Sequence, residues 1–343
     1  MRRSTGALLG AAAAAAGAVA IARREVARNR RDAEELMARE GATLPGGRVI
    51  TVHSPDGASI HAEVYGPEQA PTIVLVHGWT CSIRLWHHQV GALASAHRVV
   101  VYDKRGHGRT PRPESGDYSL DAQADELAAV LRALVPAGPR AVIAGHSMGA
   151  MTIAALAERD STCLHERAAA IAMINTGVGD LVSESLVVRG ADRFGVLGER
   201  VGAMILTSRA PLSLPESLLY PAARYVALTA DAPDEAVELT AEMARLCHPE
   251  TRAGCAESMT RMELYEALES IELPAVVVAG ELDKLTPPVH SRRLAEELGG
   301  PAEVVELEGV GHMASLEAPE RISAILRDLA ARHLGAERPV AVS

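Results

Sequence analysis

Short unbroken runs of apolar residues alternate with amphipathic segments along most of the chain. Runs such as TIVLV at residues 72–76 and RVVVY at residues 98–102 are typical of strands that are covered on both faces. Amphipathic segments with a period near 3.6 residues indicate helices. The predicted strands are residues 48–52, 59–65, 72–76, 98–102, 140–144, 168–174, 275–279 and 302–307, and the predicted helices include residues 83–95, 120–134, 148–160 and 321–334.

This order of elements predicts an α/β fold. The first two strands are separated by HSPDGA, whose Pro-Asp-Gly favours a turn, so they should form an antiparallel hairpin. From the third strand onward, strands and helices alternate, which indicates parallel pairing. We therefore expect a mainly parallel eight-stranded sheet with helices on both faces.

Residues 177–272 interrupt the alternation because they contain no strand-like run. They show helical patterns rich in Leu, Met and Ala, and roughly ninety residues are too many for a simple connection. We expect a helical cap between strands six and seven; an ordinary helical elaboration of the surface is the alternative. The expected units are an N-terminal segment 1–31, a linker 32–46, a core of residues 47–176 and 273–335, the cap 177–272 and a tail 336–343.

The N-terminal segment has no charge over residues 4–22, which is just long enough to cross a bilayer as a helix. It is weakly hydrophobic, and a cluster of arginines follows it directly, which favours retention on the cytoplasmic side. We expect an uncleaved, weak membrane anchor with the rest of the chain in the cytoplasm. A surface Ala-rich helix on a cytoplasmic protein and a cleaved export signal are the alternatives.

Composition excludes several classes of function. The formal net charge of −10 leaves no basic surplus for a nucleic-acid backbone. The 4 cysteines include no CxxC pair, so we expect reduced, structural thiols, with a Cys247–Cys255 bridge as the alternative in an exported protein. No spacing of ligands suggests a metal site, and no glycine-rich dinucleotide fingerprint appears, so we expect no cofactor.

The pentad Gly145-His146-Ser147-Met148-Gly149 lies where a predicted strand ends and a helix begins. A tight turn there would present the Ser147 hydroxyl at the carboxyl edge of the sheet, and small glycines would avoid collisions at the bend. The N–H of Met148 would stand at the helix N-terminus, where it could donate to an oxyanion. We expect the His146 side chain to point away from the nucleophile.

A serine nucleophile needs a base, and the base needs an orienting carboxylate. His312 follows the last predicted strand and Asp283 follows the strand before it, so both should lie at the same edge as Ser147. Glu281 and Asp180 are the rivals for the carboxylate. The alternative role for Asp283 is a charge pair with Lys284 or Arg292.

The loop HGWTCS after the third predicted strand should supply a second oxyanion donor. Gly78 would let the chain bend closely around a substrate, and the N–H of Trp79 is the candidate donor. We expect His77 to support this loop by hydrogen bonding.

Four motifs, VHGW, YDKRGHGRT, GHSMG and GELDKLTP…GVGHMA, resemble those of the α/β-hydrolase family in the branch of esterases, lipases and haloperoxidase-like proteins. The resemblance covers residues 47–334. It implies an α/β-hydrolase fold with the cap between strands six and seven, and a structural role for Asp103, Arg105 and Gly106. Family members such as epoxide hydrolases use an aspartate nucleophile, and Ser147 argues against that chemistry.

We therefore expect a serine hydrolase that cleaves small to medium apolar carboxylic esters through an acyl-enzyme, with Ser147, Asp283 and His312 as catalytic residues. A small-molecule ester would be its partner. Another hydrolase that uses the same triad is the alternative: a carbon–carbon bond hydrolase, a lactonase or a perhydrolase. A non-catalytic ligand-binding protein of this fold is a further alternative.

Overall fold

The computed structural model describes residues 43–136, 140–181, 207–210, 212 and 214–335, together with residues 24, 27, 28, 31, 32 and 35. The predicted membrane segment at residues 4–22 and the tail at residues 336–343 lie outside these residues. Within the described part of the chain, no helix has the length and apolar character needed to cross a membrane.

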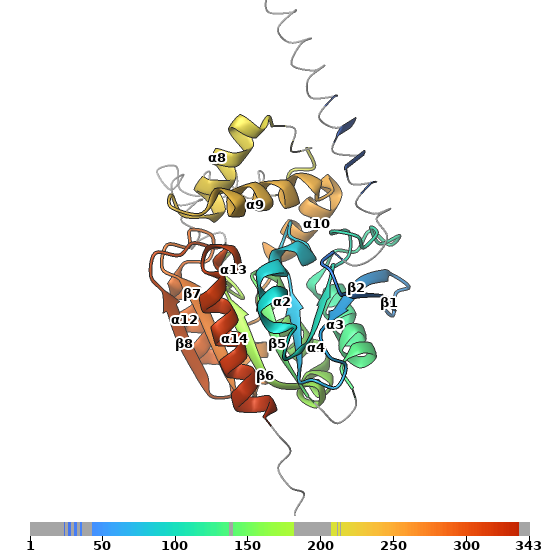
Figure 1. Cartoon of the computed structure of the whole chain (residues 1–343), viewed down its shortest axis with the longest axis vertical. Coiled ribbons are helices and arrows are strands. Elements are labelled where there is room, and N and C mark those ends of the chain that lie inside the picture. The colour runs from blue at the N-terminus through green and yellow to red at the C-terminus, as the bar shows by residue number, and fades with distance from the viewer. Residues whose placement is uncertain are drawn as a thin grey trace, which may run out of the picture.

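One sheet of eight strands forms the centre of the molecule (Figure 1). The strands are β1 (Arg48–His53), β2 (Ser59–Tyr65), β3 (Thr72–Val76), β4 (Arg98–Tyr102), β5 (Ala141–His146), β6 (Ala168–Ile174), β7 (Ala275–Gly280) and β8 (Ala302–Leu307). Their order is β1-β2-β4-β3-β5-β6-β7-β8. The β1–β2 and β2–β4 pairs are antiparallel and the others are parallel, which confirms the predicted sheet.

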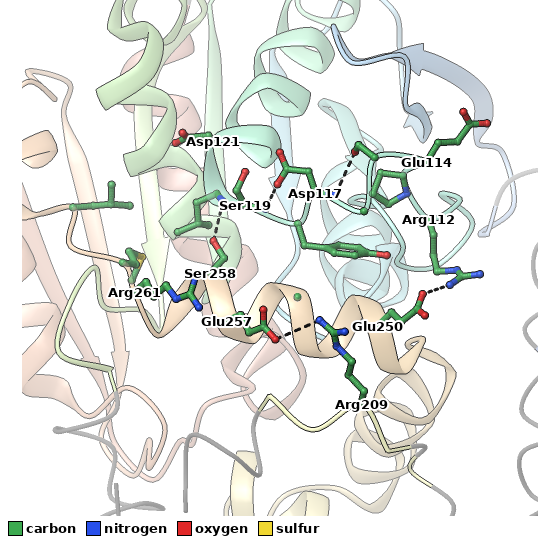
Figure 2. Close-up of a pocket in the computed structure, with 18 of the residues that line it drawn as sticks. Arg112, Glu114, Asp117, Ser119, Asp121, Arg209, Glu250, Glu257, Ser258 and Arg261 are labelled. Atoms are coloured by element: carbon green, nitrogen blue, oxygen red, sulfur yellow. Dashed lines mark hydrogen bonds and ion pairs between the residues drawn. The ribbon is translucent and has the colours of Figure 1, made fainter. Parts of the chain in front are cut away.

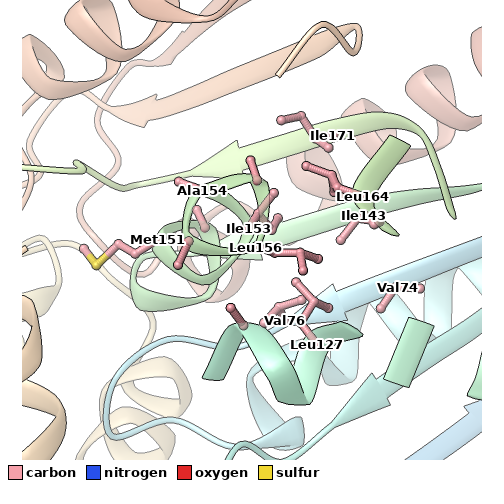
Figure 3. Close-up of a cluster of buried hydrophobic side chains, with 14 of the residues drawn as sticks. Val74, Val76, Leu127, Ile143, Met151, Ile153, Ala154, Leu156, Leu164 and Ile171 are labelled. Atoms are coloured by element: carbon pink, nitrogen blue, oxygen red, sulfur yellow. The ribbon is translucent and has the colours of Figure 1, made fainter. Parts of the chain in front are cut away.

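Helices cover both faces of this sheet because its inner strands, such as β3, β4, β5 and β7, are buried on both sides. Val74 and Val76 of β3 belong to the cluster packed under α3 (Leu120–Leu134) and α4 (Met148–Arg167), part of which Figure 3 shows. Ile73 and Leu75 face the opposite way, toward α2 (His87–Leu93) and α14 (Pro319–Leu334). The alternation of side chains along a strand thus fills two separate cores.

Two predicted helices differ in detail from the observed ones. The segment predicted at residues 83–95 begins as a short 3₁₀ turn, η1 (Ile83–Trp86), which Ser82 caps by accepting from the Arg84 N–H. The helix predicted at residues 148–160 continues to Arg167 across a kink at Asp160, where φ is −153° and ψ is 68°. The remaining helices of the core are α12 (Pro288–Glu297) and α13 (Ala314–Glu317).

Between β6 and β7 the described residues form helices and no strand. These helices are α8 (Glu216–Ala227), α9 (Asp234–Leu246), α10 (Pro249–Met259) and α11 (Tyr265–Leu268). Helices α8, α9 and α10 lie beyond one end of the sheet (Figure 1). Hydrogen bonds join them to the core there: the Trp79 indole donates to the Arg252 carbonyl over 2.9 Å, and the His312 N–H donates to the Ala227 carbonyl over 3.1 Å. The cap and the other domain boundaries stay predictions.

All four cysteines, Cys81, Cys163, Cys247 and Cys255, are buried and free. The Cys247–Cys255 bridge that the sequence left open is therefore not formed in this structure.

An ion pair without solvent contact ties the loop after β4 to α3. Arg105 and Glu126 are both fully buried, and the Arg105 Nε donates to a Glu126 carboxylate oxygen. The Arg105 guanidinium also donates to the carbonyl of Asp117 over 2.8 Å and to that of Ala122 over 3.2 Å. Arg105 therefore holds the loop after β4 in place, which is the structural role that the family resemblance implies for it.

Replacing Arg105 by Met should destabilise the fold strongly, because it leaves the Glu126 carboxylate buried without its counter-ion. Loss of one partner of a buried pair costs about 3–5 kcal/mol. Urea unfolding followed by circular dichroism measures the loss. Arg292→Met is the matched control, since Arg292 pairs with Glu306 on the surface and its loss should move the midpoint little. Equal effects of the two substitutions would contradict the prediction.

Candidate active site

Ser147 stands at a sharp turn between β5 and α4. Its φ of 51° and ψ of −121° lie in a region that residues with a side chain rarely adopt. The turn is held by main-chain bonds: the Ser147 N–H donates to the Ile174 carbonyl over 2.9 Å, and the Ser147 carbonyl accepts from the Ala150 N–H over 2.9 Å. The backbone therefore places this serine at the carboxyl edge of the sheet.

The turn is possible because Gly145 and Gly149 have no side chains. A Cβ on Gly149 would lie 2.1 Å from the carbonyl oxygen of Val76, and one on Gly145 would lie 2.4 Å from the main-chain nitrogen of Ala150. Both clashes are with backbone, which has no room to move. The pentad thus brings the start of α4 directly against the end of β3.

Asp283 and His312 form a direct pair at the same edge. Asp283 Oδ2 is 2.8 Å from His312 Nδ1, and both residues are buried. Four other groups donate to this carboxylate: the N–H groups of Leu285 and Thr286, over 2.8 and 2.9 Å, the Thr286 hydroxyl, over 2.9 Å, and the Asn175 amide, over 2.9 Å. Burial raises the pKa of Asp283, but the pairing with His312 and these donors outweigh it, so the pKa is lowered and the carboxylate stays ionised.

The contacts of the rival carboxylates lead elsewhere. Glu281 accepts from the Gly309 N–H over 2.9 Å, and Asp180 pairs with Arg293 over 2.7 Å. The alternative role for Asp283 was a charge pair with Lys284 or Arg292. Among the described residues Asp283 pairs with neither: Arg292 pairs with Glu306, and Lys284 Nζ donates to the Tyr225 carbonyl.

The structure does not join Ser147 to His312 by a hydrogen bond within the residues it describes. It does hold the two in neighbouring positions, because His146, the residue before Ser147, bonds the His312 carbonyl through Nε2 over 2.8 Å. The two imidazole rings have centroids 5.0 Å apart. The ring of His146 therefore fixes the loop that carries His312, and the expectation that it points away from the Ser147 hydroxyl stays a prediction.

Asn175 is a site residue that sequence reasoning missed. It follows β6 with a φ of 48°, and its side-chain Nδ2 donates to Asp283 Oδ2 over 2.9 Å and to the Gly311 carbonyl over 3.1 Å. It therefore links the carboxylate to the histidine loop. Its position directly after a buried strand, at the functional edge of the sheet, was the available signal.

The loop after β3 lies against the turn that carries Ser147. A Cβ on Gly78 would be 3.2 Å from the Ser147 Cβ and 2.8 Å from His146 Nδ1, so glycine allows this close approach. In the described part of the chain, the N–H groups of Trp79 and Met148 donate to no protein acceptor. Both predicted oxyanion donors are thus available, one on each side of this contact.

His77 sets the direction of the Trp79 N–H. Its Nε2 accepts from the Lys104 N–H over 3.0 Å, so its proton is on Nδ1, which donates to the Gly78 carbonyl over 2.8 Å. The carbonyl and N–H of a trans peptide point in opposite directions, so fixing the Gly78 carbonyl turns the Trp79 N–H away from His77. Burial lowers the pKa of His77 well below its ordinary value, which keeps this neutral tautomer.

A cleft of about 970 Å³ lies elsewhere, between residues 112–121 and α10 (Figure 2). None of the five predicted site residues lines it, and its walls carry charged pairs such as Arg112–Glu250 and Arg209–Glu257. This cleft is therefore separate from the serine site. The described residues contain no group of three or more His, Cys, Asp and Glu side chains arranged to hold a metal ion.

Comparisons with known proteins agree with this geometry. Residues 73–325 match the model of the alpha/beta hydrolase family. A putative carbamate hydrolase from Variovorax paradoxus is 28% identical over 276 residues, covering 77% of this chain and 97% of the relative. A non-heme chloroperoxidase from Streptomyces lividans is 26% identical over 276 residues, covering 79% and 95%.

The solved structure of an esterase from Rhodococcus sp. superposes with a TM-score of 0.70 at 22% identity, covering 83% of this chain and 99% of the other. At this level of identity, the superposition supports the fold alone.

Three histidines around the site should stay neutral in mildly acidic solution. Burial lowers the pKa of His77 well below its ordinary value, that of His107 to about 4 and that of His146 to about 3. Their ¹⁵N ring signals should therefore not titrate between pH 8 and 5. NMR of ¹⁵N-histidine-labelled protein tests this, with single His→Gln variants to assign the signals. Titration of His146 near pH 6.5 would contradict the burial argument.

Proposed function

The chain belongs to the alpha/beta hydrolase family, and from this premise we propose that it is a serine hydrolase that cleaves carboxylic esters through an acyl-enzyme. One observation carries the proposal: the hydrogen-bonded pair Asp283–His312 lies at the same sheet edge as the strained turn that presents Ser147. A nucleophile, a base and an orienting carboxylate are the groups that acyl transfer needs.

In the proposed reaction, the Ser147 oxygen attacks the ester carbonyl while His312 Nε2 accepts the hydroxyl proton. We expect the hydrogen bond between Ser147 and His312 to form when substrate binds, because catalytic hydrogen bonds tighten on substrate binding. Asp283 holds the Nδ1 side of the imidazole and stabilises its positive charge. His312 then gives the proton to the departing alcohol, and water, deprotonated by His312, releases the carboxylic acid and restores Ser147.

The N–H groups of Trp79 and Met148 support the proposal because they flank Ser147 and are free to donate. Charge develops on the carbonyl oxygen only as the tetrahedral intermediate forms, so donors fixed beforehand favour that state over the substrate. One such donor contributes about 3 kcal/mol.

A small or medium apolar ester is the proposed substrate. The support is the composition of residues 177–272, whose predicted cap is rich in Leu, Met and Ala. The names of the two relatives, a carbamate hydrolase and a non-heme chloroperoxidase, favour other acyl-transfer reactions of the same three groups as the second candidate. A panel of esters, lactones, carbamates and peracid-forming conditions separates these candidates.

Ser147→Ala should abolish hydrolysis of p-nitrophenyl esters and labelling by a fluorophosphonate probe, because the attacking oxygen is gone. Asp283→Asn should lower kcat by roughly 10⁴-fold, since the amide favours the wrong tautomer of His312. Asp180→Asn is the matched control, because Asp180 pairs with Arg293 outside the site. Full turnover by a folded Ser147→Ala variant would refute the assignment.

Attachment to a membrane through residues 4–22 is a separate proposal that rests on the sequence of that segment. Weak anchoring predicts full-length protein in the membrane fraction at neutral pH, with release by detergent. Immunoblotting of fractionated cells measures this. Recovery of the full-length chain entirely in the high-speed supernatant would contradict it.

A further inference from the structure

A buried lysine lies behind the nucleophile turn. The chain has 2 lysines, Lys104 and Lys284, among its 34 basic side chains of Lys and Arg. Lys104 is 0% exposed, and its Nζ donates to the Met148 carbonyl over 3.2 Å and to the Thr152 hydroxyl oxygen. Its side chain thus binds the first turn of α4, at the residue whose N–H is a proposed oxyanion donor.

The main chain of Lys104 reaches the other proposed donor. Its N–H donates to His77 Nε2 over 3.0 Å, and this bond sets the His77 tautomer that fixes the Gly78 carbonyl. Lys104 therefore contacts Met148 directly through Nζ and influences the Trp79 peptide indirectly, through His77 and the Gly78 carbonyl.

No carboxylate pairs with the Lys104 ammonium among the described residues. Glu126, a carboxylate that raises the pKa of Lys104, is already bound to Arg105. Burial lowers the pKa of Lys104 to about 7, with Glu126 and Cys255 raising it and Arg105 lowering it. Titratable and charged groups from four elements surround Lys104. They are Glu126 of α3, Cys255 of α10, His77 of the loop after β3, and Arg105 and His107 of the loop that carries Lys104.

We propose that Lys104 is a positioning residue for the oxyanion hole, and that its ammonium form supports a faster reaction than its neutral form. This inference rests on the proposed function. The neutral amine still donates hydrogen bonds to Met148 and Thr152, so the geometry remains when the proton leaves. What is lost is a positive charge beside the turn where negative charge develops on the substrate.

The sign of the pH effect follows from a pKa of about 7. Below that pH Lys104 is charged, and above it Lys104 is neutral, so kcat should fall as pH rises through this value. An arginine at position 104 would keep its charge throughout this pH range, whereas a buried lysine can lose it.

Lys104→Met tests the proposal by kinetics. Met matches the length of the lysine stem and removes a buried unpaired charge, so the variant should fold. We expect kcat at pH 6 to fall roughly tenfold, less than for loss of a direct donor, with KM little changed. We also expect the decline of kcat above pH 7 to disappear. Lys284→Met is the control and should keep the wild-type pH profile.

Thr152→Val is a second variant that leaves Lys104 in place. It removes the hydroxyl that accepts from the ammonium, so the proton should leave Lys104 at a lower pH. The decline of kcat should shift to lower pH accordingly. If Lys104→Met does not fold, this shift decides the question. A wild-type alkaline decline in a folded Lys104→Met variant, or in Thr152→Val, would overturn the proposal.

NMR separates this inference from the proposed function. With two lysines, ¹³C-lysine-labelled protein gives two Cε signals, and Lys104→Met assigns them. The Lys104 signal should titrate near pH 7 whether or not the protein cleaves esters; absence of titration between pH 5.5 and 9 would overturn the inference. Failure of Ser147→Ala to abolish turnover would instead overturn the proposed function, while the NMR result for Lys104 stands.

Discussion

The close crossing of the β5–α4 turn over the end of β3 is the constraint on which the site depends. Gly149 lies where any Cβ would meet the Val76 carbonyl at 2.1 Å, and Gly78 lies where a Cβ would approach Ser147. These two contacts accompany the positive φ at Ser147 and allow the Trp79 loop to lie beside the start of α4. The proposed nucleophile and its two candidate oxyanion donors therefore depend on one piece of backbone packing. A side chain at position 149 is excluded, because its Cβ would clash with the Val76 carbonyl, and one at position 78 would crowd Ser147 and His146.

The order of strands completes the arrangement. β5, β6, β7 and β8 are consecutive neighbours in the sheet, and all four are parallel. Their carboxyl ends therefore present Ser147, Asn175, Asp283 and His312 along one edge, although the chain separates Ser147 from His312 by 165 residues. Asn175 bridges the middle of this row by bonding Asp283 and the carbonyl of Gly311. His146 closes it by bonding the His312 carbonyl. Parallel pairing thus converts distant sequence positions into adjacent groups without a long connecting loop.

The sequence predicted what depends on local pattern. Apolar runs gave all eight strands, and the pentad with the segments after β7 and β8 pointed to Ser147, Asp283 and His312. It did not predict the roles of Asn175, His146 or Lys104, because each depends on a partner that tertiary packing supplies: a carboxylate, a loop carbonyl and the first turn of α4. A polar residue beside an apolar run indicates that its side chain needs a hydrogen-bond partner when it is buried. The sequence does not show which group is that partner. The 3₁₀ start at Ile83 has the same origin, since Asp103 from the next loop accepts its N–H over 2.8 Å.

Partners, rather than position, distinguish the histidines around Ser147. His77, His107 and His146 are buried and bond main-chain groups, so burial lowers the pKa of each and they remain neutral. A neutral histidine whose N–H already donates to a carbonyl can hold a loop in place. It has no carboxylate partner to stabilise the positive charge that a second proton would bring. His312 alone among these four is paired with a carboxylate, which compensates the positive charge that the imidazole acquires as a base. The same low-dielectric surroundings that keep these three rings neutral strengthen the interaction between Asp283 and His312. Burial and pairing together therefore support the proposal that His312 is the base, independently of the motif that contains it.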